Sequence, residues 1–419
     1  MTSQDHPDVL QPATLGPVRL RNRVLKAATY ENMARDGLVT DALIDFHVEH
    51  ARGGVGMTTV AYCAVAPDGR TDGHQIVWRP EALPGLRTLT DAVHDAGAAI
   101  SAQIGHSGPV NNAKATGTRA IAPSRHFNKQ FLRTVGPAGR DDITRVIAAH
   151  GSAAQMALDT GFDAVEVHLG HNYLASSFLS PKLNRRKDEY GGSLANRARF
   201  ALEILGAVRD AVQDKIAIVV KLNMDDGVPG GFWLEEAIQV AQWIEQSGNA
   251  DALEMTAGSS LLNPMYLFKG DSPIAEFAAV IPEPIRTGVK LVGKHVLREY
   301  PYSDGYLLDD ALQIRSAVSM PMILLGGVTN RLTMDSAMSN GFEFVAMGRA
   351  LLRDPDLINK LSDDPSIRSL CNHNNKCMTT IFTGTRCVLR SQNLPSPLSN
   401  AARPRSIRKA DTEGALHAG

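Results

Sequence analysis

Cysteine is scarce in this chain of 419 residues: there are four, and three of them lie close together near the C-terminus. So few cysteines do not make the disulfide framework of a small secreted protein. The chain also lacks any apolar run of about 18 residues, which excludes a membrane-spanning helix. Its first segment, Met1 to Pro12, is polar and interrupted by proline, without the apolar core of a signal peptide. We therefore expect a soluble, cytoplasmic protein.

An excess of charge of either sign is missing as well. Lysine and arginine number 43 and aspartate and glutamate 44, which gives a formal net charge of -1. This balance argues against a nucleic-acid-binding surface and against an acidic tail that recruits a partner. No Gly-x-Gly-x-x-Gly followed by a helical pattern occurs, so no separate Rossmann domain is encoded. Hydrophobic residues make up 43% of the chain, which is enough for a sizeable core.

Eight short apolar runs do occur, and amphipathic segments separate them, as in successive parallel βα units. Eight is the number of strands that a closed (β/α)8 TIM barrel needs, so we expect this α/β fold. The strands are expected at Val24–Ala28, Met57–Tyr62, Ala98–Ile104, Ala164–Val167, Ile216–Leu222, Ala252–Met255, Met322–Leu325 and Phe344–Ala346. The helices are expected at Asp41–Arg52, Glu81–Ala96, Asp141–Thr160, Leu194–Val212, Leu234–Gln246, Leu307–Val318 and Leu332–Asn340.

This alternation also predicts the domain organisation. We expect a single barrel over residues 1–364, and a connection from Gly258 to Gly305, after the sixth strand, that is long enough to be a lid. A short cysteine-containing segment, residues 365–390, is expected to pack on the barrel. The tail, residues 391–419, is rich in Pro, Ser, Arg and Ala without apolar periodicity, and we expect it to be flexible.

The most informative stretch is 166–173, which reads Glu-Val-His-Leu-Gly-His-Asn-Tyr. His168, His171 and Tyr173 directly follow the fourth expected strand, and loops at the carboxyl ends of barrel strands build active sites. Residues 188–193 then read Asp-Glu-Tyr-Gly-Gly-Ser. Both pieces, in this order and at this spacing, resemble the Old Yellow Enzyme family of flavin-dependent ene-reductases.

The resemblance implies non-covalent FMN, which NADPH or NADH reduces and from whose N5 an α,β-unsaturated carbonyl compound then takes hydride. In such a site His168 and His171 would hydrogen-bond the carbonyl oxygen of the substrate and stabilise the developing enolate-like charge. Tyr173 would give the proton to Cα. The resemblance further implies a small-molecule substrate and a homo-oligomer.

Candidate phosphate ligands follow the last two expected strands, which is the recurring phosphate-binding place in such barrels. Gly326 and Gly327 follow the seventh strand, and Gly348 and Arg349 follow the eighth. Glycine lets backbone N–H groups approach an anion, and arginine adds charge-assisted hydrogen bonds. The series resembles the flavin-phosphate signature of the family.

Earlier strands supply further candidates for cofactor binding. The resemblance implies that Gln103, at the end of the third strand, lies against the pyrimidine edge of the flavin. Lys221 ends an apolar strand, where a charge is costly unless it is paired, and the resemblance implies a place near the N1–C2 edge. Ala27, Ala28 and Thr29 would provide backbone contacts and a floor.

Tyr30 departs from the family pattern. Relatives often have a threonine or cysteine at this position, which tunes the potential of the flavin. A tyrosine could instead hydrogen-bond the substrate or fill space, and we count it among the catalytic candidates.

The late cysteines Cys371, Cys377 and Cys387 resemble those of relatives that ligate a [4Fe–4S] cluster with four cysteines. Asn374 stands where another cysteine would be, and such clusters are normally held by four thiolates. We therefore expect no metal. The same argument disfavours the alternative of an oxidative flavin/iron–sulfur dehydrogenase, similar to an amine dehydrogenase or a dienoyl-CoA reductase.

Two interpretations from other classes stay open. His168 and His171 could bind a catalytic metal in a barrel lyase or hydrolase, although no third ligand at a suitable spacing is evident. The barrel could also bind FMN without turnover and act as an interaction protein through its tail.

Overall fold

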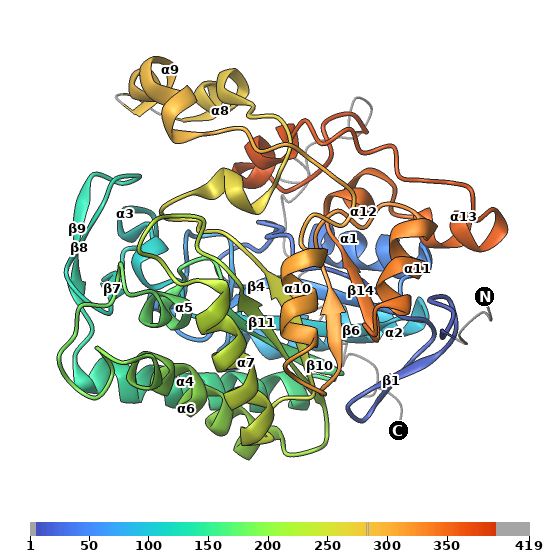
Figure 1. Ribbon diagram of the computed structural model, residues 1–419, viewed down its shortest axis with the longest axis horizontal. Coiled ribbons are helices and arrows are strands. Elements are labelled where there is room, and N and C mark those ends of the chain that lie inside the picture. The colour runs from blue at the N-terminus through green and yellow to red at the C-terminus, as the bar shows by residue number, and fades with distance from the viewer. Residues whose placement is uncertain (1–5, 282, 284, 391–419) are drawn as a thin grey trace, which may run out of the picture.

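The computed structural model describes residues 6–390, apart from 282 and 284, and its centre is a closed barrel of eight parallel strands (Figure 1). Each strand pairs with the next along the chain, and the last pairs with the first. The strands are β3 (Val24–Lys26), β4 (Met57–Ala64), β6 (Ala99–Gly105), β10 (Ala164–Leu169), β11 (Ala217–Asn223), β12 (Ala252–Thr256), β13 (Met322–Leu324) and β14 (Phe344–Met347). The (β/α)8 fold that the sequence predicts is therefore confirmed, and the strand ends differ from the expected ones by at most two residues.

Helices follow the strands and cover the outside of the barrel. The seven expected helices form α1 (Asp41–Arg52), α2 (Leu83–Asp95), α4 (Arg140–Asp159), α6 (Leu194–Val212), α7 (Leu234–Ser247), α10 (Leu308–Arg315) and α11 (Arg331–Ser339). Side chains of Thr40, Ser193 and Asn330 cap α1, α6 and α11 by accepting hydrogen bonds from backbone N–H groups of the first turn. Shorter helices also occur: α3 (Ala113–Thr116), α5 (Leu174–Leu179), α12 (Arg349–Arg353) and α13 (Leu357–Asp363).

Alternate residues of each barrel strand face its interior, because side chains along a strand point to opposite faces. Near the amino-terminal end these interior residues are small or apolar, as at Ala164, Ala217 and Ala252. A hairpin of β1 (Ala13–Leu15) and β2 (Val18–Leu20) closes this end, and its leucines Leu15 and Leu20 are buried in the same cluster. Further along the strands the interior positions become polar, and there the candidate site begins.

The connection after β12 differs from the long loop that the sequence predicts. It contains η4 (Pro264–Leu267), α8 (Ile274–Val280) and α9 (Ile285–Val296). The two helices project as a pair from one end of the barrel (Figure 1). α8 packs against η5 (Lys376–Phe382), where Lys376 Nζ lies 2.7 Å from Glu276 Oε1. Apolar periodicity did not predict these helices because prolines divide the segment into short pieces.

Smaller elements surround the same end of the barrel. β5 (Ile76–Val77) pairs with β4, and β7 (Ile121–Ala122), β8 (His126–Asn128) and β9 (Arg133–Pro137) form a separate sheet. Three 3-10 turns complete the connections: η1 (Pro67–Gly69), η2 (Pro80–Ala82) and η3 (Gly108–Val110).

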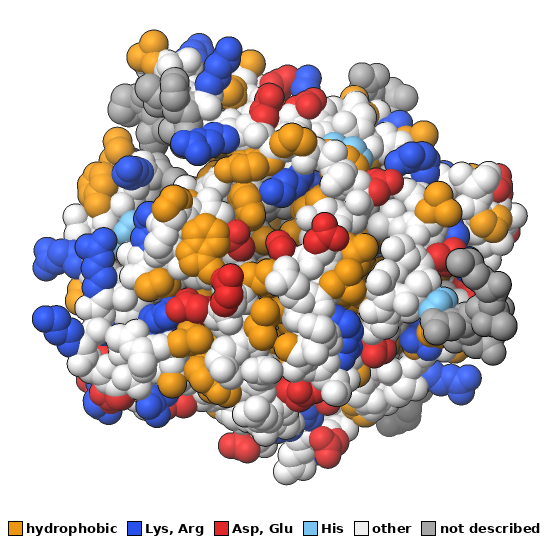
Figure 2. Space-filling view, in the orientation of Figure 1, with side chains coloured by type: hydrophobic (Ala, Val, Ile, Leu, Met, Phe, Trp, Pro, Cys, Tyr) orange, Lys and Arg blue, Asp and Glu red, His pale blue; other side chains and the backbone are white. Residues whose placement is uncertain are grey.

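Residues 365–390 contact the barrel at several points. The backbone N–H of Thr385 donates to the carbonyl of Glu31, 2.9 Å away, and Arg390 forms an ion pair with Glu49 on α1. The expected flexible tail, 391–419, lies outside the described residues. Within the described residues, no helix has the length and apolarity needed to cross a membrane. Figure 2 shows basic and acidic side chains interspersed over one face of the molecule.

Candidate active site at the carboxyl ends of the barrel strands

The structure brings His168, His171 and Tyr173 together. His168 lies on β10, and the other two follow in the turn that leads to α5. The ring centroids of the two histidines are 5.1 Å apart, and the Tyr173 ring lies 4.8 Å from that of His168. Tyr62, from β4, packs edge-on against Tyr173 at 5.2 Å. Two imidazoles and a phenol thus form one cluster, close enough to contact a single small molecule.

An unusual turn places these rings. His171 and Asn172 both adopt the left-handed conformation, with φ of 61° and 57°. Asn172 Nδ2 donates to Asp226 Oδ1 at 3.0 Å, and the His171 N–H donates to Asn223 Oδ1 at 3.4 Å. Asn223 in turn donates to the same Asp226 oxygen at 3.0 Å. Burial raises the pKa of Asp226 to about 6. The sequence gives no local sign of this carboxylate, because its contact with the turn spans 54 residues.

Both imidazoles are neutral at neutral pH. Burial, and then the charge of Lys221, lowers the pKa of His171 to about 3, and burial also holds the pKa of His168 well below its usual range. His171 Nε2 bonds to Thr256 Oγ1 at 2.9 Å. His168 Nδ1 is buried and has no hydrogen-bond partner among the described residues. A buried polar atom without a partner is costly in a folded protein, so this nitrogen is suited to a ligand.

Tyr173 remains a phenol over the same range. Burial, followed by the charge of Asp72, raises its pKa well above the usual value. It can therefore donate a proton or a hydrogen bond at neutral pH.

Lys221 lies inside the barrel between two carboxylates. Its Nζ is 2.9 Å from Glu166 Oε1 and 2.6 Å from Glu254 Oε1, and all three side chains are buried. Gln103 Nε2 also donates to Glu166 Oε1. The lysine charge is therefore paired, as its burial requires. Gln103 and Lys221 were predicted from the sequence as site residues, whereas the two glutamates were not, although each occupies an interior position on its strand.

The protonation of this group follows from its burial. Burial alone would lower the pKa of Lys221, but the charges of Glu166 and Glu254 outweigh it and raise that pKa. Burial, and then the charge of Glu166, raises the pKa of Glu254 to about 8. Burial and the Glu166 charge thus oppose ionisation of Glu254, whereas the two carboxylates favour the charged form of Lys221.

Tyr30 follows β3 in the left-handed conformation, with φ of 51°. Its hydroxyl donates to Asp72, and its ring packs in the same apolar cluster as Tyr62 and Tyr173. Thr385 donates a hydrogen bond from its hydroxyl to the Tyr30 carbonyl at 2.5 Å. Tyr30 thus lies beside the histidine–tyrosine cluster, and Asp72 is a partner that the sequence did not identify.

The expected phosphate ligands lie around the ends of β13 and β14. Gly326 and Gly327 have φ of 99° and 79°, and a Cβ on Gly327 would lie 2.6 Å from the backbone nitrogen of Gly305. Only glycine fits that close approach. Within the described residues, the backbone N–H groups of Gly326, Gly327 and Gly348 donate no hydrogen bond.

Arg349 begins α12, beside these amides. Its Nη1 donates to the Lys269 carbonyl at 2.9 Å and to the Asn375 side-chain oxygen. The predicted first-strand contacts are nearby: a Cβ on Gly348 would lie 3.6 Å from the Thr29 methyl carbon. The Ala27 N–H donates to the Met347 carbonyl at 3.0 Å, and Ala28 packs beside Tyr30.

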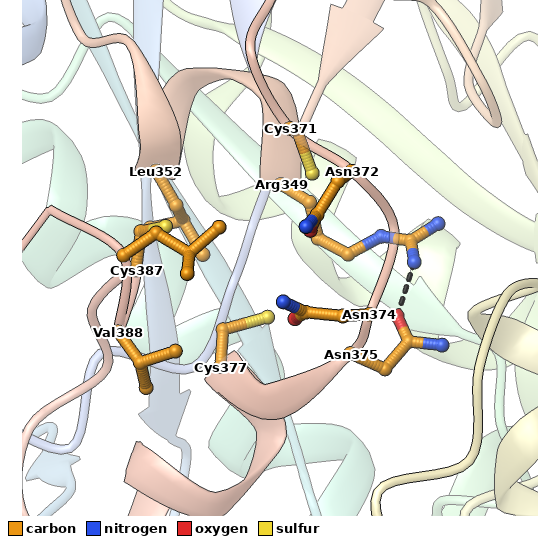
Figure 3. Close-up of a pocket in the computed structure, with 10 residues that line it drawn as sticks. Arg349, Leu352, Cys371, Asn372, Asn374, Asn375, Cys377, Cys387 and Val388 are labelled. Carbon is orange, nitrogen blue, oxygen red and sulfur yellow. Dashed lines mark hydrogen bonds between the residues drawn. The ribbon is translucent and has the colours of Figure 1, made fainter.

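The late cysteines line a cavity of their own. Cys371, Cys377 and Cys387 border it, together with Asn374 and Arg349 (Figure 3). Within residues 6–390, apart from 282 and 284, no group of three or more His, Cys, Asp or Glu side chains is arranged to hold a metal ion.

Known proteins are similar to this chain along most of its length. The family model for NADH:flavin oxidoreductase / NADH oxidase matches residues 8–260. The chain is 50% identical over 390 residues to the 4,4'-dithiodibutanoate disulfide reductase of Rhodococcus erythropolis, covering 93% of this chain and 97% of that protein. It is 32% identical over 377 residues to the metal reductase of Desulforamulus reducens, covering 89% of this chain but 52% of that protein.

Solved structures share the fold. The 2-naphthoyl-CoA reductase in complex with 2-naphthoyl-CoA superposes with a TM-score of 0.78 at 25% identity, over 91% of this chain and 56% of that one. The old yellow enzyme homologue of Zymomonas mobilis gives a TM-score of 0.69 at 21% identity, over 88% and 96% of the two chains.

A (β/α)8 barrel with a charged interior and a polar cluster where its strands end has the layout of a barrel enzyme, and the family match makes it an oxidoreductase. The chain belongs to the NADH:flavin oxidoreductase / NADH oxidase family, and its resemblance to the Old Yellow Enzymes is confirmed. It is an NAD(P)H-dependent flavin oxidoreductase, and its cofactor is FMN.

The residues present fit this cofactor. Free backbone amides at Gly326, Gly327 and Gly348 suit a phosphate. The Lys221 ammonium and the Gln103 amide suit the polar edge of a flavin ring, and His168 Nδ1 still lacks a partner.

Proposed function

We propose that this oxidoreductase reduces the activated C=C bond of small α,β-unsaturated carbonyl compounds. The observation that carries the proposal is the cluster of two neutral imidazoles and one protonated phenol within about 5 Å, beside the buried Lys221. Neutral imidazoles can donate N–H hydrogen bonds to a carbonyl oxygen. A phenol can then protonate the adjacent carbon.

In this proposal FMN, when bound, supplies the hydride that NADPH or NADH has delivered to N5. The chain itself orients the reactants. Gly326, Gly327, Gly348 and Arg349 would hold the phosphate, and the backbone of Ala27, Ala28 and Thr29 would line the ring together with Gln103.

The electrostatic contribution comes from three side chains. His168 and His171 bind the carbonyl oxygen and stabilise the negative charge that develops on it, which is worth more in a site that excludes water. The Lys221 ammonium would face the N1–C2 edge of a bound flavin and would favour negative charge there. Two glutamates hold this ammonium in place.

Tyr173 transfers the proton that completes the reaction. Burial raises its pKa, so the hydroxyl keeps its proton until an enolate-like oxygen and carbon develop beside it. The proton goes to Cα as hydride reaches Cβ, and the saturated carbonyl compound results. Tyr30, fixed by Asp72, forms part of the substrate wall.

A second acceptor class has a specific observation in its favour. The relative from Rhodococcus erythropolis, at 50% identity over nearly the full length of both chains, is a disulfide reductase. Hydride transfer to one sulfur of an organic disulfide, with protonation of the leaving thiolate, would give two thiols at the same site. A thiolate is a stable leaving group, so this reaction depends less on Tyr173 than alkene reduction does.

The test compares the two acceptors on one enzyme preparation. The holoenzyme is reduced anaerobically with NADPH and mixed in a stopped-flow instrument with 2-cyclohexenone or with 4,4'-dithiodibutanoate, and flavin absorbance is followed. Faster reoxidation by cyclohexenone, with cyclohexanone as product, supports the first proposal. Reoxidation only by the disulfide, with two thiols formed, supports the second and refutes the first. Iron analysis of the same sample tests the disfavoured flavin/iron–sulfur dehydrogenase.

A further inference from the structure

The cysteine cavity contains a histidine–thiol contact that the proposed reaction does not use. Cys371 Sγ lies 3.8 Å from His373 Nδ1, within hydrogen-bond range for sulfur. The His373 ring stacks on Tyr302, with 3.4 Å between centroids and 10° between planes. Burial, and then the charge of Arg349, lowers the pKa of His373 to about 4. His373 is therefore neutral at neutral pH, and burial raises the pKa of Cys371, so the thiol keeps its proton until its sulfur reacts.

A second thiol faces the same space. Figure 3 shows the sulfur atoms of Cys371 and Cys377 directed into the cavity that both residues line. The chain between them folds back through two left-handed residues, His373 with φ of 58° and Asn375 with φ of 54°. A water-sized molecule can occupy about 20 Å³ of this cavity, which is partly open to solvent. All three of its cysteines are free and half-buried, so a small oxidant can reach them.

We propose that Cys371 and Cys377 form an oxidation site, in which a hydroperoxide converts the two thiols into a disulfide. As the Cys371 sulfur attacks the peroxide oxygen, His373 Nδ1 takes the thiol proton and passes it to the departing oxygen, which leaves as an alcohol or water, and Cys371 becomes a sulfenic acid. The Cys377 sulfur then attacks the Cys371 sulfur and displaces its hydroxyl group as water, while the Cys377 proton is lost. Two thiols and one hydroperoxide thus yield one disulfide, one alcohol or water, and one further water.

The pair Cys371–Cys377 is favoured over a pair with Cys387 by the length of the loop that each closes. A bond across the 371–377 turn closes a short loop whose fold-back already exists, so little chain entropy is lost. Cys387 serves as an internal control, because it lines the same cavity but belongs to a later stretch of chain.

The cysteine site contacts Arg349, the proposed FMN-phosphate ligand, through one side chain. Asn375, inside the closed loop, accepts a hydrogen bond from Arg349 and donates one to the Asp271 carbonyl at 2.9 Å. Drawing Cys371 and Cys377 to bonding distance must move Asn375 and thereby change how Arg349 is held. This second part rests on the proposed role of Arg349 in binding the FMN phosphate.

The first experiment is peptide mapping of the holoenzyme after treatment with hydrogen peroxide. Lys376 and Arg386 place the three cysteines on different tryptic peptides. The expected product links the peptide of Cys371 to that of Cys377, without reducing agent, at a mass two hydrogens below the sum. Cys387→Ser should give the same product. Cys377→Ser should instead leave a sulfenic acid on Cys371 that dimedone traps.

The role of His373 is tested by rate. His373→Phe keeps the stacked ring but removes the base, and it should slow disulfide formation about tenfold. A linked peptide that contains Cys387, or no linked peptide at all, would overturn the site, and an unchanged rate in His373→Phe would overturn the role of the base. None of these measurements needs a working flavin.

The coupling is tested by FMN affinity. Oxidation of the wild-type protein should raise the Kd for FMN by about tenfold, which is the loss expected for one charge-assisted hydrogen bond. Arg349→Met in the reduced protein should raise this Kd by about the same factor. If Arg349→Met has no effect, the proposed role of Arg349 fails. If Arg349→Met weakens binding and oxidation does not, the coupling fails while that role stands.

Discussion

The side-chain amide of Asn172 donates a hydrogen bond to the Asp226 carboxylate, with 3.0 Å between Nδ2 and Oδ1. Asn172 is the second of two consecutive residues in the left-handed conformation, and the first is His171. That conformation is costly for residues with a side chain, so the surrounding bonds must hold it. Asp226 therefore supports the turn that directs the His171 ring toward His168.

Replacing Asp226 with Asn should loosen this turn. The Asp226 carboxylate accepts hydrogen bonds from two side-chain amides and from the Phe232 N–H. An asparagine at this position would place its own NH2 group, which is also a donor, against one of these donors. We expect the free energy of unfolding to fall by about 1–3 kcal/mol and acceptor reduction to slow by about tenfold or more, through displacement of His171.

Urea unfolding and steady-state kinetics measure the two effects. Asp214→Asn is the matched control, because Asp214 is 96% exposed and has one ion pair, with Arg209. It should change stability by less than about 0.5 kcal/mol. Equal effects of the two substitutions would contradict the positioning role of Asp226.

Tyr173→Phe should separate the two halves of the catalytic cycle. It removes the proposed proton donor and retains the ring that packs on His168 and Tyr62. Flavin reduction by NADPH needs no proton from Tyr173 and should keep its rate, whereas alkene reduction should fall by about 10²–10³. Stopped-flow absorbance measures each half separately. Tyr62→Phe, a like change in the adjacent ring, should affect neither half, and an unimpaired Tyr173→Phe would refute the assignment.

Much of the fold could be predicted from the sequence because its signals are local. Each barrel strand is a short, mostly apolar run, and each outer helix has apolar periodicity. His168, His171 and Tyr173 also lie within six residues of one another, so one motif contains them. In contrast, α8 and α9 lie in a proline-interrupted segment whose helices depend on contacts with each other and with η5.

The partners of the site residues could not be predicted, because they lie far from those residues in the sequence. Glu166 and Glu254 meet Lys221 only because β10, β11 and β12 are neighbours in register, with His168 opposite Lys221 and Lys221 opposite Glu254. Asp72 is 42 residues from Tyr30 in the sequence, and Asp226 is 54 residues from Asn172. Charged residues at interior positions of apolar strands were the one available signal.

Glu254→Gln should flatten the pH dependence of stability. Burial raises the pKa of Glu254 from 4.5 to about 8, so between these values the folded protein binds more protons than the unfolded chain. The stability from this group is complete below about pH 4.5 and is lost as pH rises through about 8. Relative to Glu254→Gln, wild type should lose up to about 1.4 kcal/mol per pH unit across that range.

Unfolding in urea at intervals from pH 5 to 9 measures this slope. Glu235→Gln, at an exposed position in the first turn of α7, should follow the wild-type profile. Parallel profiles for wild type and Glu254→Gln would show that Glu254 carries no proton at neutral pH.

Lys221→Met should be the most destabilising of these substitutions, and its cost should depend on Glu254. Methionine removes the only cation between two buried carboxylates within the described structure, and breaking a buried ion pair in this way costs about 3–5 kcal/mol. Adding Glu254→Gln leaves one carboxylate, still bonded to Gln103, and removes the like-charge repulsion. The double variant should therefore be more stable than Lys221→Met alone, although Glu254→Gln by itself removes a contact with Lys221.

A double-mutant cycle by urea unfolding at pH 9, where Glu254 is ionised in wild type, measures this coupling. If the effects of the two substitutions on the free energy of unfolding are additive at pH 9, Lys221 and Glu254 do not interact as an ion pair. The proposal that Glu254 holds the Lys221 ammonium in place would then be wrong.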